Sequence, residues 1–493
     1  MGVIARQGVK YGIVSYLSFL LGTVSTIFIY PYDTEFLGQI RFIQPSAEII
    51  YPFVVFGLSY ANIRFHQRFK AQNQQIDFLW FSVKCLAVNF AAIALIYCLL
   101  AALFPRIALS DSWQMRQFVL PAVLFLAVTQ LFARYISNLK RVAITGIFEN
   151  FFPKLGSLTA FLLFVYLGFS LKFSLYIFIA FFALAAVGLG FYFFRLNKDR
   201  KSGSMSMLDD KKFRSELFFF CLFSLLGNVG NQWALRIDNF MIAELIDYKQ
   251  NGIYSILMSI VGFLTVPLLG IYAISGPVIV EKLENNKLED LNQFYRKVSK
   301  FLFLFGMVLL ACIFAGMDSL FALMKNGQDL LNAKSVVYIL GSATLFDLAT
   351  GFNSQIISYS KHYRFNIYAL LFLAVITVSL NWLFIVHFKW GIEGVAWATA
   401  ISLTLFNVIK LIFNYKKFGI YPFSKIYINI LAVGVFSVFL AWFLPDFKNI
   451  FFNLIFKPSI VIIFFLISNL FFKFISFKEI LNTNLKTFLT GKK

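Results

Sequence analysis

The fold of this chain is decided by the stretch Asn231-Gln232-Trp233-Ala234-Leu235-Arg236-Ile237-Asp238, which lies inside the long apolar run 218–281. The run is long enough for two membrane-spanning helices, since a helix needs about 20 apolar residues to cross the hydrocarbon core. Its first half nevertheless carries a full positive and a full negative charge. A charge at membrane depth costs about 2.5–3.5 kcal/mol, so it normally faces a protein interior or a water-filled cavity. The stretch therefore predicts a membrane helix that lines a polar site.

The region after this stretch has a counterpart near the N-terminus. The motif Asp247-x4-Gly252 repeats Asp33-x4-Gly38, and a proline and a glycine follow each copy at almost the same offsets, namely Pro267 and Gly270 in one and Pro52 and Gly57 in the other. Internal repeats around a shared cavity are typical of membrane transporters. The repeat therefore predicts a transporter built from two related halves.

The composition is that of a polytopic membrane protein. The 493 residues are 60% hydrophobic and only 14% charged, whereas soluble proteins carry about 25% charged residues. The net charge of +21 is explained by Lys and Arg in cytoplasmic loops rather than by a nucleic-acid partner. The four cysteines lie in apolar segments and the three histidines are scattered, so neither a disulfide framework nor a metal centre is expected.

Fourteen segments are long and apolar enough to span a membrane. They are 9–30, 40–63, 78–104, 117–137, 142–168, 173–194, 217–245, 252–279, 299–323, 335–359, 365–387, 391–414, 425–444 and 450–472. Alternate loops collect the basic residues, with Lys410, Lys416 and Lys417 counted on the same side as both ends of the chain. The positive-inside rule then predicts that both termini are cytoplasmic.

The longest polar segment divides the predicted helices into groups. We expect an N-lobe of six helices in 1–195, a cytoplasmic linker in 196–214, a C-lobe of six helices in 215–415, and a final pair of helices with a cytoplasmic tail in 416–493. The linker is charged and contains Ser and Gly, which is typical of a flexible connection.

Polar residues inside two of the segments are candidates for a cavity wall. On segment 217–245, Asn231 and Asp238 share one face, and Gln232 and Arg236 share the neighbouring one. The alternative is structural: a charge pair between Arg236 and Asp238, with amide hydrogen bonds that hold helices together. On segment 40–63, Arg41 and Glu48 share a face, although Arg41 could instead extend to the membrane interface. Pro45 and Pro52 are expected to kink or break this segment, either to line a cavity or for packing alone.

Two further groups leave the same choice open. Segment 335–359 carries a stripe of Asp347, Thr350, Ser354 and Ser358, which suits hydrogen bonding to sugars and equally suits a helix–helix interface. Arg134, Glu149 and Lys154 lie near segment ends and are either residues of a cavity mouth or paired charges.

Motifs for catalysis are missing from the sequence. It contains no GxxxxGK[ST] phosphate loop, no HExxH, no GxSxG and no glycine-rich dinucleotide fingerprint. The acidic run Asp33-Thr34-Glu35 allows a membrane glycosyltransferase as an alternative, but charged turn residues explain it more simply. We therefore expect a transporter rather than an enzyme.

The chain resembles the polysaccharide transporter (O-antigen flippase-like) family of the multidrug/oligosaccharidyl-lipid/polysaccharide exporter superfamily. The resemblance is carried by the pattern from Gly12 to Tyr30 with Gly38, Pro52 and Gly57, by Arg236-Ile-Asp238-Asn-Phe-Met-Ile, by Asn251-Gly252-Ile-Tyr254-Ser255, and by Gly276-Pro277. The layout of six, six and two helices also fits, so the resemblance covers nearly the whole chain.

The resemblance implies an all-α membrane protein in which two six-helix lobes form a V with pseudo-two-fold symmetry, followed by two C-terminal helices. It implies alternating access of a central cavity and flipping of an undecaprenyl-pyrophosphate-linked oligosaccharide across a bacterial inner membrane. Arg41, Arg236 and Lys154 would then hold the pyrophosphate. Asn231, Asp238 and Asp347 would contact the sugar or couple transport to a proton or sodium ion, while Glu48, Gln232 and Ser354 complete the set of cavity candidates.

Partners and competing functions follow from the same resemblance. Membrane lipids and the polymerase or export machinery of polysaccharide synthesis are the expected partners, and no cofactor is expected. A lipid II flippase and a cation-coupled drug antiporter of the same superfamily remain as alternatives, as does a membrane glycosyltransferase or polymerase.

Overall fold

The computed structural model describes residues 3–197 and 206–474, and these residues are helical with no strands. This confirms the predicted all-helical class. Part of the expected linker 196–214 and nearly all of the C-terminal tail lie outside the described residues.

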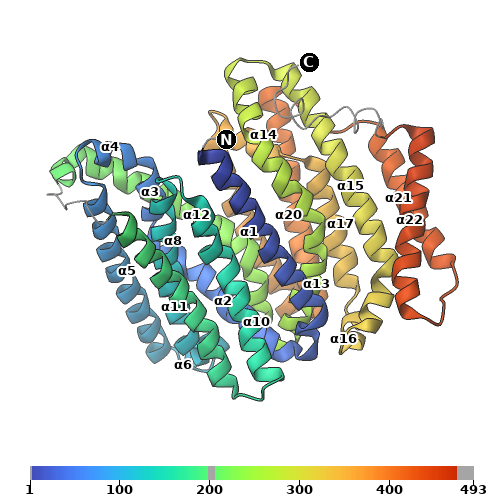
Figure 1. Ribbon diagram of the computed structural model, residues 1–493, viewed down its shortest axis with the longest axis horizontal. Coiled ribbons are helices and arrows are strands. Elements are labelled where there is room, and N and C mark those ends of the chain that lie inside the picture. The colour runs from blue at the N-terminus through green and yellow to red at the C-terminus, as the bar shows by residue number, and fades with distance from the viewer. Residues whose placement is uncertain (1–2, 198–205, 475–493) are drawn as a thin grey trace. The chain divides into compact units, whose positions relative to one another are not determined.

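Every one of the fourteen predicted segments coincides with a helical stretch (Figure 1). Ten stretches are long and apolar enough to cross a membrane. They contain α1 (Val3–Phe28), α5 (Gln75–Leu103), α8 (Arg116–Ser137), α11 (Leu171–Leu196), α12 (Lys211–Leu245), α15 (Leu288–Leu323), α19 (Tyr363–Trp382) with η5 (Leu383–His387), α20 (Gly391–Phe418), α21 (Ile426–Phe443) and α22 (Ile450–Phe472).

Four predicted segments are interrupted. Two are bent pairs that pass the same test when each is taken as one span: α2 (Thr34–Val55) with α3 (Leu58–Arg64) at 57°, and α17 (Ser335–Thr350) with α18 (Asn353–Tyr359) at 47°. The other two are α9 (Val142–Gly146), η2 (Ile147–Phe151) and α10 (Phe152–Val165), and α13 (Tyr248–Gly262), η4 (Phe263–Thr265) and α14 (Val266–Glu284). By length and hydropathy the described residues thus hold ten to twelve candidate spans. Adding the two interrupted stretches at 142–165 and 248–284 gives a total consistent with the fourteen predicted segments.

The predicted break in segment 40–63 follows Pro52 rather than Pro45. Phe56 and Gly57 both adopt left-handed backbone angles, with φ of 47° and 71°. The amide of Phe56 still donates to the carbonyl of Pro52, so α2 keeps its hydrogen bonds up to the bend. Pro45 lies inside α2, before this break. In the matching segment, the 3₁₀ turn η4 ends at Thr265, directly before α14, and Pro267 is the second residue of α14.

The chain forms two compact units, Met1–Ile256 and Leu257–Lys493. In unit 1, α2 packs against α12, α8 and α5, and α11 packs against α8 and α10. In unit 2, α15 packs against α17, and the pair α21 and α22 packs on α15 (Figure 1). The predicted division into lobes at 196–214 stays a prediction.

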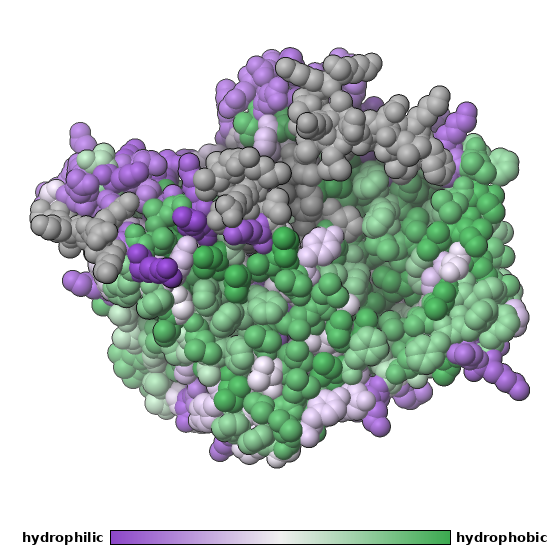
Figure 2. Space-filling model, viewed as in Figure 1, coloured by the Kyte–Doolittle hydropathy of each residue, from purple (hydrophilic) through white to green (hydrophobic). Residues whose placement is uncertain are grey.

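Hydrophobic side chains cover most of the molecular face in view, and hydrophilic ones gather at helix ends (Figure 2). Large apolar side chains are mostly exposed on several helices, such as Phe191 on α11, at 71%, and Phe471 on α22, at 78%. Such surfaces are stable in lipid and not in water.

The repeated motif packs against itself in unit 1. Asp33 accepts a hydrogen bond from the amide of Phe36 at 2.9 Å and caps α2, while Asp247 accepts one from the amide of Gln250 at 2.6 Å at the start of α13. A Cβ on Gly38 would lie 1.7 Å from the carbonyl oxygen of Tyr248. Reciprocally, a Cβ on Gly252 would lie 1.8 Å from the carbonyl oxygen of Thr34. The two copies therefore make equivalent contacts, backbone against backbone.

Asp33 belongs to the acidic run that allowed a membrane glycosyltransferase as an alternative function. Its carboxylate is engaged in the helix cap, as a charged turn residue would be. Local structure thus explains Asp33 as a capping residue.

Candidate functional site

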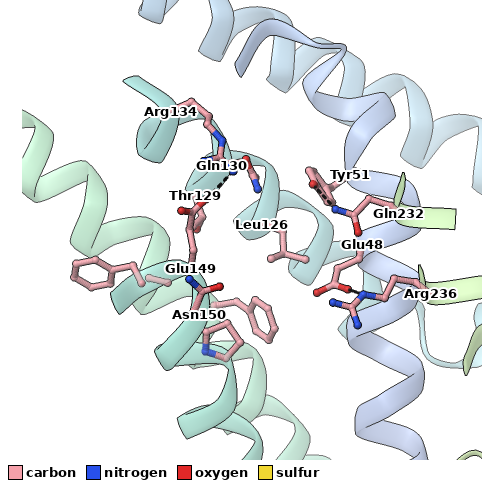
Figure 3. A pocket seen from close by; sticks show the side chains of 14 residues that line it. Glu48, Tyr51, Leu126, Thr129, Gln130, Arg134, Glu149, Asn150, Gln232 and Arg236 are labelled. Carbon is pink, nitrogen blue, oxygen red and sulfur yellow. Dashed lines mark hydrogen bonds and ion pairs between the residues drawn. The ribbon is translucent and has the colours of Figure 1, made fainter. Parts of the chain in front are cut away.

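A cavity of about 240 Å³ lies inside unit 1 among the membrane helices (Figure 3). Five elements contribute to it: α2, α8, η2 with the start of α10, α11 and α12. The lining residues are Glu48, Tyr51, Leu126, Thr129, Gln130, Arg134, Phe148, Glu149, Asn150, Pro153, Phe182, Ala185, Gln232 and Arg236. Charged, amide and hydroxyl side chains predominate, so the cavity suits a hydrophilic ligand.

One wall is built from α2 and α12. Arg236 forms an ion pair with Glu48 through its Nε, and Gln232 donates to the Tyr51 hydroxyl at 2.9 Å (Figure 3). Helical spacing explains the alignment, because Gln232 and Arg236 are four residues apart, while Glu48 and Tyr51 are three apart. Gln232 and Arg236 both line this cavity, and their role in binding a substrate stays a prediction.

The Glu48 carboxylate is held in place from its own helix as well. Gln44, one turn earlier, donates a hydrogen bond to Oε1 of Glu48 at 2.8 Å. The Glu48 side chain is only 12% exposed. Arg236 is 40% exposed, so its guanidinium keeps free donors toward the cavity while the pair compensates the buried charge of Glu48.

The opposite wall contains a second pair of opposite charges. Arg134 on α8 and Glu149 on η2 lie 3.7 Å apart, with Thr129, Gln130 and Asn150 beside them in the lining. The element η2 is a π-helical turn, and such turns are common at functional sites because they redirect side chains. The sequence left open whether Arg134 and Glu149 are cavity residues or paired charges. In the structure they pair with each other and also line the cavity.

Two predicted cations lie near the first wall without lining the cavity. Arg41 interacts electrostatically with Glu48 and with Arg236, and its Nε is buried without a hydrogen-bond partner. The Lys154 ammonium donates to the carbonyl of Ser18 at 3.0 Å and interacts electrostatically with Arg41. Arg41 therefore interacts with the Glu48 carboxylate and with both other predicted cations.

The other predicted residues of α12 face elsewhere. Asp238 is 6% exposed and accepts a hydrogen bond from the Tyr254 hydroxyl at 2.9 Å, so it packs toward α13. Asn231 is exposed and is not among the cavity residues.

Asp347 and Ser354 belong to unit 2 and join a buried network with α20. Asp347 accepts from the Asn407 amide at 2.8 Å, and Ser354 accepts from the Lys410 ammonium at 2.7 Å. The assignment of Lys410 to a cytoplasmic loop was wrong, because this lysine is 2% exposed inside α20. Hydropathy averages hid it, since one lysine does not interrupt a long apolar segment.

Sequence reasoning also missed Tyr51, Thr129, Gln130 and Asn150. Their polar side chains inside apolar segments were the available signal, but their convergence depends on packing between helices. Among the described residues, no group of three or more His, Cys, Asp or Glu side chains could hold a metal ion.

Comparison with known proteins supports the fold. A family model described as MatE matches residues 224–383, and no curated protein matches the sequence significantly. An inward-facing multidrug resistance MATE family transporter of the MOP superfamily superposes with a TM-score of 0.61 at 14% identity, covering 82% of this chain and 94% of that one.

Two other solved structures are similar. The lipid II flippase MurJ in its inward closed conformation superposes with a TM-score of 0.60 at 16% identity, covering 94% of this chain and 99% of that one. A MOP superfamily transporter from Pyrococcus furiosus, described as having a binding pocket of reverse polarity, gives 0.54 at 14%, covering 85% and 95%. The chain thus has a MatE match in its middle third and the fold of these transporters.

Proposed function

We propose that this protein is a flippase that moves an undecaprenyl-pyrophosphate-linked oligosaccharide from the cytoplasmic to the outer leaflet of a bacterial inner membrane. The observation that carries the proposal is the polar cavity among the membrane helices, lined by two pairs of Arg and Glu and by amide and hydroxyl groups. A sugar headgroup cannot cross hydrocarbon unaided, because its polar groups would lose their hydrogen bonds to water. A flippase must replace those hydrogen bonds and needs no catalytic group.

The character of the cavity favours a glycan over a lipophilic drug. Sites for drug-sized molecules are mostly apolar and about 300–1,000 Å³ in volume. The cavity here, of about 240 Å³, is smaller and mainly polar. It suits one part of a larger ligand, with the amide and hydroxyl groups of Gln130, Asn150 and Gln232 available to sugar hydroxyls.

The cluster of Arg41, Lys154 and Arg236 supports an anionic ligand. Arg236 and Arg41 interact with the carboxylate of Glu48, and Lys154 interacts with Arg41, so positive charge exceeds negative charge among these four residues. Guanidinium groups bind phosphate with directed, charge-assisted hydrogen bonds. In this proposal the pyrophosphate binds the cluster and the sugars occupy the cavity.

Two other transport functions have support. The MatE match and the similarity to a multidrug resistance transporter favour a cation-coupled antiporter of small molecules. The similarity to MurJ over 94% of this chain favours a lipid II flippase. Both share the transport mechanism and differ in the ligand.

The test is a flipping assay in proteoliposomes loaded with fluorescent undecaprenyl-pyrophosphate oligosaccharide. We expect protein-dependent loss of the outer-leaflet signal, slowed about tenfold or more in Arg236→Ala, since one charge-assisted hydrogen bond contributes about 1.5–3 kcal/mol. Lys84→Ala is the matched control, because Lys84 is an exposed lysine of α5. Lipid II and a cationic drug serve as competitors.

Each result has a consequence for the proposal. Absence of flipping by folded protein, with ion-driven uptake of the drug, would establish the antiporter instead. Flipping that only lipid II suppresses would assign the second alternative. Equal flipping by wild type and Arg236→Ala would remove the cation cluster from the mechanism.

The proposal also sets the cellular context. Both termini lie in the cytoplasm, and the expected partners are membrane lipids together with the enzymes that polymerise or export the polysaccharide.

A further inference from the structure

Basic side chains gather at one end of unit 1. They belong to α3, to the short helix α4 (His66–Ala71) and to the start of α12, and none of them lines the cavity. Residues 58–72 and 206–216 hold six Lys or Arg side chains and three Asp or Glu side chains, so positive charge is in excess. Hydrophilic side chains cover this end (Figure 2), which carries the label α4 in Figure 1. The exposed basic residues are Arg64, Arg68, Lys70, Lys211, Lys212 and Arg214.

A shared aromatic cluster holds these elements together. Phe65, Phe69 and Phe213 are buried, and the ring of Phe213 lies edge-on to the other two, at centroid distances of 5.4 and 5.5 Å. The segment before α12 is fixed as well, because the buried Gln74 amide donates to the Ser206 hydroxyl at 2.7 Å and accepts from the next backbone amide at 3.3 Å. The basic side chains therefore project from a packed surface.

Arg64 is positioned to bind an anion. Its guanidinium carbon lies 5.1 Å from the ring centroid of Phe220 and 5.9 Å from that of Phe65. Such cation–π contacts hold the guanidinium and leave its N–H groups to other acceptors. Arg68 also lies over Phe65, at 5.4 Å, but it forms an ion pair with Glu216 at 2.7 Å. Within the residues that the structure describes, Arg64 has no carboxylate partner of this kind.

The start of α12 lies where a membrane surface is expected. The 35 residues of this helix extend for about 52 Å at 1.5 Å per residue, which exceeds the hydrocarbon thickness of about 30 Å. Its basic first turn is therefore the end that projects beyond the hydrocarbon. Two turns later, Phe218 and Phe219 are 53% and 56% exposed, and Ile63 next to Arg64 is 41% exposed. Positive charge thus borders an apolar surface suited to acyl chains.

We propose that Arg64, together with the basic first turn of α12, binds the phosphate of an anionic membrane phospholipid, whose acyl chains lie against Ile63, Phe218 and Phe219. A guanidinium can donate two parallel hydrogen bonds to phosphate oxygens. The neighbouring lysines add attraction to an anionic headgroup at the membrane surface. The lipid contacts α3 and α12 at once, so it stabilises their packing against each other, whichever cargo the protein carries.

Native mass spectrometry of the delipidated full chain tests this site, by titration with phosphatidylglycerol and, separately, with phosphatidylcholine of the same acyl chains. We expect tighter binding of phosphatidylglycerol, weakened about tenfold or more in Arg64→Gln, because hydrogen bonds to charged groups contribute this much to affinity. Arg68→Gln is the matched control, since it removes the same charge from the same surface but Arg68 is engaged by Glu216. It should change the affinity by no more than about twofold.

Two further variants separate a phospholipid site from general attraction. Arg64→Lys keeps the charge without the parallel N–H groups and should bind with intermediate affinity. Phe219→Ser should weaken the binding of the long-chain lipid, because it removes apolar contact with an acyl chain. Equal losses in Arg64→Gln and Arg68→Gln would overturn the proposal, because they would show diffuse electrostatic attraction. Equal binding of phosphatidylcholine, or displacement of the lipid by an equal concentration of glycerol 3-phosphate, would overturn it as well.

The melting midpoint distinguishes a lost site from a damaged fold. Arg64 is exposed, so Arg64→Gln without lipid should melt at the wild-type temperature. Phosphatidylglycerol should raise the midpoint of the wild type and of Arg68→Gln, and should leave that of Arg64→Gln unchanged. An equal rise in all three proteins would show that the stabilising lipid binds elsewhere.

Discussion

At the scale of single residues, the sequence did not predict which charged side chains would form ion pairs with each other. Helical spacing predicted that Gln232 and Arg236 face one way, because that periodicity is local. The partner of Arg236 is Glu48, on a helix 188 positions earlier in the chain. Likewise, the convergence of Arg134 and Glu149 depends on how α8 packs against η2.

The pair of Glu48 and Arg236 makes a prediction about stability. Glu48→Gln or Arg236→Gln alone should lower the free energy of unfolding by about 1–3 kcal/mol, because each leaves the other side chain, 12% exposed in Glu48 and 40% in Arg236, without its ion-pair partner. The double variant should recover part of the loss, with a coupling energy of about 0.5–3 kcal/mol. Denaturation of the four proteins in detergent measures this cycle.

The exposed pair of Arg68 and Glu216 is the control. Their side chains are 54% and 42% exposed, so Arg68→Gln should change stability by no more than about 1 kcal/mol. Strictly additive losses at Glu48 and Arg236 would contradict the pairing.

At the scale of elements, each of the fourteen segments predicted from apolar length coincides with a helical stretch, whereas interruptions were predicted only where proline marked them. The bend after Pro52 was expected, but the bend at Gly351 has no proline beside it, and the π turn η2 precedes Pro153, which was not interpreted as a break. The π turn carries Glu149, and the bend at Gly351 separates Asp347 on α17 from Ser354 on α18.

Where α2 and α13 cross, Gly38 and Gly252 are expected to tolerate no larger residue. Gly38→Ala or Gly252→Ala should prevent normal packing, since the added Cβ would meet a backbone carbonyl at 1.7 Å or 1.8 Å and backbone cannot move aside like a side chain. Gly190→Ala on α11 is the matched control, because no atom lies within 4 Å of its Cβ position. It should be neutral or stabilising by up to about 1 kcal/mol.

The measurement for this crossing is the yield of monodisperse protein in detergent and its melting midpoint. Normal yield and melting of Gly38→Ala would show that the two helices can separate at this point.

The bend at Gly351 makes a separate prediction. Gly351→Ala combines a left-handed φ of 58° with a Cβ placed 2.1 Å from the Ser299 hydroxyl, so it should cost more than about 1–3 kcal/mol, the range for backbone strain alone. Gly391→Ala has a similar φ of 60° and open space around its Cβ, so it reports the strain without the collision. Unfolding midpoints of the two variants should differ, and equal midpoints would mean that Ser299 simply rotates away.

At the scale of the whole molecule, the alternation of basic loops predicts the topology. Single cysteines at Gln72 and Lys140, in a background without native cysteine, should react with an impermeant maleimide only after the membrane is opened. Cysteines at Leu109 and Phe169 should react in intact cells, because an odd number of spans separates these loops from the other two. A fluorescent protein fused to the C-terminus should be bright if that end is cytoplasmic.

The labelling experiment also counts spans. Reaction at Gln72 and Leu109 from the same side would mean that α5 does not cross the membrane, and would change the topology of everything after it.

The reciprocal contact between Gly38 and Gly252 has a consequence for the origin of the chain. Thr34 meets the second motif as Tyr248 meets the first, which is the pattern of an isologous interface, where residue i touches j and j touches i. Such a contact is self-complementary, so the same short segment could have joined two identical half-length subunits before they were fused. The covalent chain would then preserve, in two glycines and two capping aspartates, the interface of an ancestral homodimer.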